Sequence, residues 1–192
     1  MPFNIPILLT WLRIVLIPLM IAVYYIPENW VHGVGRDLAA TLIFTVAAAT
    51  DWLDGYLARR WNQTSAFGAF LDPVADKLMV AAALIMLVQL GRLDAILAAI
   101  IIGREITISA LREWMAQIGA HKSTAVSMIG KIKTTAQMVA IPLLLYRAPI
   151  DGFNVQEAGT WLIYVAAVLT LWSMGYYMRM AWPHLLEQDR KH

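Results

Sequence analysis

Long apolar stretches separated by short polar breaks make up most of this chain. Each stretch is roughly the 17–25 residues that a helix needs to cross a hydrocarbon core, although the fifth is short. The six stretches cover residues 7–26, 38–59, 73–90, 95–118, 132–146 and 158–178. Two of the breaks carry the turn-forming sequences Pro27-Glu28-Asn29 and Gly91-Arg92. The pattern predicts an all-α, polytopic membrane protein folded as a six-transmembrane-helix bundle.

The composition agrees with a lipid environment. Hydrophobic residues make up 60% of the 192 residues and the mean hydropathy is +0.62, whereas soluble domains are roughly 45–50% apolar. We expect one integral membrane domain over residues 1–192 and no cleaved signal peptide. The net charge of only +2 argues against nucleic-acid binding, and the absence of cysteine excludes disulfides and thiolate metal sites.

The basic residues between the apolar stretches are distributed unequally. One set of connections holds Arg59, Arg60, Arg112, Lys122, Lys131, Lys133, Arg179, Arg190 and Lys191. The opposite set holds only Arg36, Arg92 and Arg147. Because cytoplasmic loops of membrane proteins are enriched in lysine and arginine, the first set is expected in the cytoplasm. Both termini then face the cytoplasm, as an even number of spans requires.

Acidic residues are concentrated where the second apolar stretch ends and the third begins. Asp51 and Asp54 are three positions apart, and Asp72 and Asp76 are four apart, so each pair shares one helix face. A short connection folds the two helices back on each other, which allows the pairs to meet. Four carboxylates in a membrane pocket repel one another unless nearby cations offset their negative charge.

This set of residues favours divalent cations as the positive charge that offsets the carboxylates. Ligands that are all oxygen, without histidine or cysteine, suit Mg²⁺ or Mn²⁺ better than zinc. Two such ions bridged by Asp51, Asp54, Asp72 and Asp76 would form a site for phosphoryl transfer. Structural roles stay open for single residues: Asp72 before Pro73 suits a helix N-cap, and Asp51 and Asp54 could pair with Arg59 or Lys77.

The spacing of these residues carries a family resemblance. The segment reads Asp51-x2-Asp54-Gly55-x2-Ala58-Arg59-x8-Gly68-x3-Asp72-x3-Asp76. This pattern resembles the full signature of the CDP-alcohol phosphotransferase family. The segments GREITISALREWMA (103–116) and GKIKTTAQMVA (130–140) are similar to the branch whose acceptor is glycerol 3-phosphate. Near the N-terminus the chain departs from the pattern, because Ile7 stands where a polar residue is expected after Asn4-Ile5-Pro6.

The resemblance implies a homodimeric six-helix enzyme of a bacterial inner membrane, with its active site facing the cytoplasm. It would transfer the phosphatidyl group of CDP-diacylglycerol to glycerol 3-phosphate by a single in-line displacement that releases CMP. It implies that Asp51, Asp54 and Asp72 bind two Mg²⁺ ions gripping the donor diphosphate, and that Asp76 contacts one metal and acts as general base. The residues implied in CDP-lipid binding are Gly55, Ala58, Arg59 and Gly68.

A pocket for glycerol 3-phosphate should be cationic, since the acceptor is an anion. The candidates for binding its phosphate are Arg104, Arg112, Lys131 and Lys133, with hydroxyl contacts from Thr107, Ser109 and Thr134. For the two lysines, snorkelling at the start of a helix is an equal alternative. Neighbouring positions on a helix diverge by about 100°, so Glu105 is expected to point away from Arg104, leaving it free for a phosphate.

Two alternatives remain open at this point. The same chemistry could use another acceptor, such as an inositol phosphate or phosphatidylglycerol. A divalent-ion transporter could use the aspartates as an ion path, although the chain lacks the internal repeats that transporters often show.

Overall fold

The computed structural model describes residues 5–61, 66–117, 128–150 and 152–189. These residues form six α-helices: α1 (Ile5–Val23), α2 (Gly33–Trp61), α3 (Ala66–Gln89), α4 (Ala95–Gln117), α5 (Met128–Tyr146) and α6 (Val155–Asp189). The one β-type feature in the described residues is an isolated bridge between Ile150 and Phe153. The predicted all-α class and the six helices in this order are therefore confirmed.

Helix α3 begins earlier than its apolar pattern predicted. It starts at Ala66, so Asp72 and Pro73 lie inside the helix. The suggestion that Asp72 caps the helix with Pro73 at its first position is therefore wrong. Proline removes one backbone hydrogen bond from a helix interior and disfavours helical backbone in the preceding residue. Here the helix nevertheless runs through that position.

The end of α3 follows its turn sequence. Gly91 adopts a φ of +67°, a left-handed conformation that favours glycine. The Arg92 amide donates to the Leu87 carbonyl at 2.8 Å and the Gly91 amide to the Val88 carbonyl at 3.0 Å. This pair of bonds is a Schellman motif, which satisfies the last carbonyls of the helix. The break predicted at Gly91-Arg92 is confirmed.

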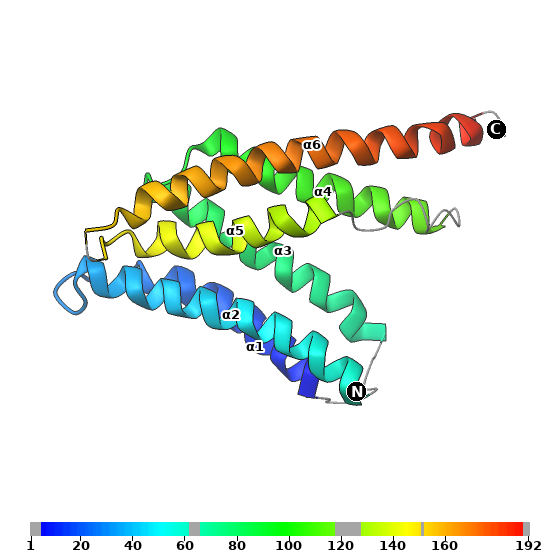
Figure 1. The fold of residues 1–192 in the computed structure, drawn as a ribbon. Coiled ribbons are helices and arrows are strands. Elements are labelled where there is room, and N and C mark those ends of the chain that lie inside the picture. The colour runs from blue at the N-terminus through cyan, green and yellow to red at the C-terminus, as the bar shows by residue number, and fades with distance from the viewer. Residues whose placement is uncertain (1–4, 62–65, 118–127, 151, 190–192) are drawn as a thin grey trace.

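The helices pack side by side along most of their length (Figure 1). Helix α1 packs against α2 and α3, and α6 packs against α4 and α5. The turn between α1 and α2 and the connection between α5 and α6 lie at the same end of the bundle. The first turn of α1 and the last turns of α6 lie toward the other end.

A salt bridge joins several helices near the end that carries the α1–α2 turn. Arg92 donates to both carboxylate oxygens of Asp37 at 2.7 and 2.8 Å. It also donates to the Leu145 carbonyl at 2.6 Å, at the end of α5. The Tyr24 hydroxyl contributes a further bond to Asp37 at 3.3 Å. Because Arg92 and Asp37 are both nearly buried, the pair fixes α2, α5 and the α3–α4 turn relative to one another.

The apolar side chains divide into a core and an outer surface. The largest buried members of the core include Met20, Phe44, Met79, Leu84, Ile101 and Leu144. Large apolar side chains are also exposed on every helix, among them Leu8, Leu42, Phe70, Ile96, Val139 and Trp172. Judged by length and composition alone, one helix of the described residues could cross a membrane, over Val155–Trp182 of α6. The other predicted spans stay predictions.

Candidate active site

A buried arginine from α1 connects the acidic residues of α2 and α3. The Arg13 side chain is fully buried, with an exposed fraction of 0%. Its Nη1 atom lies 2.8 Å from Asp76 Oδ1 and 3.1 Å from Asp51 Oδ1, and its Nη2 atom lies 2.5 Å from Asp54 Oδ2. One guanidinium therefore brings carboxylates from two helices together, and the two acidic pairs converge.

Thr10 holds the fourth carboxylate. Its hydroxyl donates to Asp72 Oδ1 at 2.5 Å. Thr10 and Arg13 are three positions apart on α1, so they lie on the same face of that helix. One face of α1 thus contacts all four acidic residues, which we call the aspartate cluster (Asp51, Asp54, Asp72 and Asp76).

The cluster has a closed side and an open side. The side chain of Asp54 is only 3% exposed, whereas those of Asp51 and Asp76 are 36% and 33% exposed. A substrate can therefore reach Asp51 and Asp76 while Asp54 stays covered. Asp51 and Asp54 both form ion pairs with Arg13, a partner that the sequence did not suggest beside its alternatives Arg59 and Lys77. Of these two alternatives, the side chain of Arg59 lies outside the described residues.

The chemistry of the cluster suits a hard divalent cation. Among the described residues, no group of three acidic or histidine side chains has the geometry of a metal site. The Arg13 guanidinium lies among the carboxylates of the cluster. The carboxylates nevertheless converge on a positive charge, and the donors are all oxygen. Such a set matches the preferences of Mg²⁺ and Mn²⁺, so the residues present fit the predicted ions.

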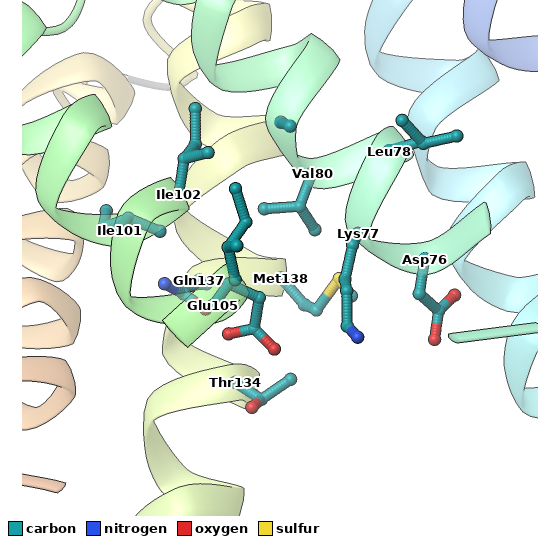
Figure 2. A pocket seen from close by; sticks show the side chains of 12 residues that line it. Asp76, Lys77, Leu78, Val80, Ile101, Ile102, Glu105, Thr134, Gln137 and Met138 are labelled. Carbon is teal, nitrogen blue, oxygen red and sulfur yellow. The ribbon is translucent and has the colours of Figure 1, made fainter. Parts of the chain in front are cut away.

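A cavity of about 210 Å³ adjoins the cluster at Asp76 (Figure 2). Its polar lining residues are Asp76, Lys77, Glu105, Thr134 and Gln137. In Figure 2 the Glu105 carboxylate lies above Thr134, and Lys77 and then Asp76 lie to its right. Side chains such as Val80, Ile102 and Met138 make the remaining wall apolar. The cavity therefore offers polar groups beside Asp76 and an apolar wall beyond them.

The two predicted arginines of α4 face α6 instead of lining this cavity. Arg104 is 3% exposed and donates to Glu105 at 2.5 Å and to the Ser173 hydroxyl at 3.1 Å. Arg112 contacts Tyr177, with 3.4 Å to its hydroxyl and 5.3 Å to the centre of its ring. The expectation that Glu105 points away from Arg104 is wrong, because both long side chains bend across the 100° between their positions.

The remaining predicted site residues are only partly described. Gly68 is buried in α3. The hydroxyls of Thr107 and Ser109 donate to backbone carbonyls of their own helix, those of Gly103 and Glu105. The side-chain positions of Gly55, Ala58, Arg59, Lys131 and Lys133 lie outside the described residues, although all five belong to helices α2 and α5.

Sequence reasoning missed Arg13 and Thr10 as site residues. A signal was present, because Arg13 is a charge within an apolar stretch of α1. Such residues are costly in a membrane and usually face a partner inside the bundle. The pattern could show that Arg13 needs an acidic partner, but not which one.

Comparison with known proteins decides the family. The family model for CDP-alcohol phosphatidyltransferase matches residues 3–172. The chain belongs to the CDP-alcohol phosphatidyltransferase family. It is therefore an enzyme, and the transporter alternative is excluded.

Relatives resemble this CDP-alcohol phosphatidyltransferase along their whole length. The CDP-diacylglycerol–glycerol-3-phosphate 3-phosphatidyltransferase of Escherichia coli strain K12 is 55% identical over 190 residues, which are 98% of this chain and 100% of the relative. The proteins of the same name from Shigella sonnei strain Ss046 and Shigella flexneri serotype 5b strain 8401 are 55% and 54% identical, with the same coverage.

Proposed function

We propose that this enzyme transfers the phosphatidyl group of CDP-diacylglycerol to glycerol 3-phosphate, forming phosphatidylglycerophosphate and CMP. The observation that carries the proposal is the convergence of Asp51, Asp54 and Asp76 around one point. The names of the full-length relatives supply the two substrates. The spacing of the acidic residues in the family signature places each pair on one helix face, and this allows the convergence.

The aspartate cluster would hold two divalent ions, Mg²⁺ or Mn²⁺. Bound there, such ions supply positive charge that offsets the donor diphosphate and the charge that develops on the departing CMP. The protein contributes carboxylates already gathered from two helices, with Thr10 fixing the orientation of Asp72. Ligands held in place before binding lose less freedom when the substrate arrives.

Asp76 would act as the general base. Its carboxylate is one-third exposed and lines the cavity beside the cluster. The acceptor hydroxyl would give its proton to Asp76 while its oxygen forms a bond to the lipid-side phosphorus. The bond from that phosphorus to the CMP oxygen breaks on the opposite side, and CMP leaves with the bonding electrons. No covalent enzyme intermediate is required.

The phosphate of the acceptor would bind on the α4–α6 side. Arg104 and Arg112 both lie there, and the Nε atoms of both are buried and have no hydrogen-bond partner among the described residues. A phosphate offers acceptors for such donors. Lys131 and Lys133, near the start of α5, would add positive charge to the same region.

The enzyme would span the inner membrane of a bacterium six times, as a homodimer with both termini and the active site toward the cytoplasm. Support comes from the exposed apolar side chains present on all six helices, which suit a lipid solvent. A charge within an apolar helix pairs inside the bundle, as Arg13 of α1 does with Asp54. Pairing of this kind reduces the cost of charges at membrane depth.

CMP release from the purified enzyme tests the reaction directly. The enzyme in detergent is incubated with CDP-diacylglycerol and, in separate reactions, with glycerol 3-phosphate, inositol 1-phosphate or phosphatidylglycerol. We expect CMP with glycerol 3-phosphate alone, its loss in EDTA, and its return with excess Mg²⁺. CMP release with a different acceptor alone would refute the substrate assignment, and full activity in EDTA would refute the metal site.

A further inference from the structure

Arg13 contacts three of the four members of the aspartate cluster directly. It is in contact with Asp51, Asp54 and Asp76 at 3.1, 2.5 and 2.8 Å, and it is fully buried. We infer that Arg13 substitutes for a divalent cation in the metal-free enzyme, holding the cluster together and lowering its affinity for metal. This inference rests on the metal site proposed above.

The charges show why a substitute is needed. Three carboxylates contact this single guanidinium, and Asp72 lies beside them at Thr10. Without Arg13 the carboxylates would repel one another at close range in a poorly solvated site. The arginine therefore keeps the metal-free site assembled.

The positions of the oxygens show why Arg13 and metal compete. Arg13 takes one oxygen from each of three carboxylates: Oδ1 of Asp51, Oδ2 of Asp54 and Oδ1 of Asp76. A metal ion entering the cluster requires oxygens of the same carboxylates and meets a fixed positive charge beside them. Both effects oppose metal binding, so removal of the Arg13 charge should strengthen it.

Arg92, a second largely buried arginine, serves as a control for Arg13. Arg92 pairs with one carboxylate, that of Asp37, and with the backbone carbonyl of Leu145. Neither partner belongs to the aspartate cluster. Loss of Arg92 should destabilise the fold without changing the affinity for metal, whereas loss of Arg13 should change both.

The test measures metal binding and thermal unfolding of the full-length enzyme in detergent, without substrates. Mn²⁺ binding is followed by electron paramagnetic resonance, and the Tm is recorded in EDTA and in excess Mg²⁺. For Arg13→Met we expect an Mn²⁺ Kd about tenfold lower than for the wild type. We also expect a lower Tm in EDTA and a larger rise in Tm on addition of Mg²⁺. Arg92→Met should lower the Tm in both buffers and leave the Mn²⁺ Kd unchanged.

The possible results separate the two proposals. Unchanged or weaker Mn²⁺ binding by Arg13→Met would overturn the inference and leave Arg13 as a brace that supports the metal ligands. If neither the wild type nor Arg13→Met binds Mn²⁺, the metal site itself is refuted, and the inference with it. Arg13→Gln, which keeps a polar side chain without the charge, carries the same expectations should Arg13→Met fail to fold.

Discussion

Arg13 Nη1 lies 2.8 Å from Asp76 Oδ1, although 63 positions separate the two residues in the chain. Asp76 also lines the cavity beside the aspartate cluster. The residue proposed to accept the proton is thus oriented from one side by α1 and remains accessible from the other.

Replacement of Asp76 by asparagine should abolish most turnover and leave donor binding intact. The amide keeps the size of the side chain but cannot accept the proton of the acceptor hydroxyl, and loss of a general base typically costs about 10²–10⁴-fold in rate. CMP release and binding of CDP-diacylglycerol are the two measurements. Asp94→Asn is a suitable control, because Asp94 is exposed and accepts a local bond from the Ile96 amide. Wild-type rates for Asp76→Asn would exclude its role as base.

Replacement of Arg104 by alanine should raise the KM for glycerol 3-phosphate or abolish turnover, while binding of CDP-diacylglycerol is spared. The KM for each substrate, measured separately, checks this. Ser173→Ala removes the bond that directs Arg104 toward α6, so a smaller rise in the same KM is expected. Unchanged kinetics in Arg104→Ala would place the acceptor phosphate elsewhere.

The proposed orientation can be tested by cysteine labelling, because the natural chain has no cysteine to interfere. Asn154 is exposed next to the start of α6, and Gln117 is exposed at the end of α4. In intact spheroplasts, a maleimide that cannot cross membranes should label Asn154→Cys and spare Gln117→Cys. Both should react after the membrane is made permeable. The reverse pattern would invert the topology.

Replacement of Asp37 by asparagine should destabilise the fold without weakening catalysis in the folded fraction. The change leaves the buried Arg92 without its charged partner, and breaking a buried ion pair typically costs about 3–5 kcal/mol. Thermal unfolding measures the loss. Because Asp37 is not a member of the aspartate cluster, the KM values for both substrates should stay at wild-type levels; altered KM values would show that the salt bridge influences the site.

Several features could be predicted from local sequence. The six helices follow from the spacing of apolar stretches, and the end of α3 follows from Gly91. The acidic pairs share helix faces because of their three- and four-residue spacing. The start of α3 could not be predicted in this way, because proline is common at the first position of a helix, whereas here the helix begins seven residues before Pro73.

The sequence by itself determined the helix order, the family signature and the acidic residues that have to converge, since these depend on neighbours within a few positions. Only the tertiary structure decided that Arg13 pairs with Asp54 and Asp76, and that Arg104 turns toward Ser173. A periodic pattern shows which residues share a face of one helix. The partner of that face depends on how all six helices pack, and long charged side chains can then reach across to whichever neighbour the packing provides.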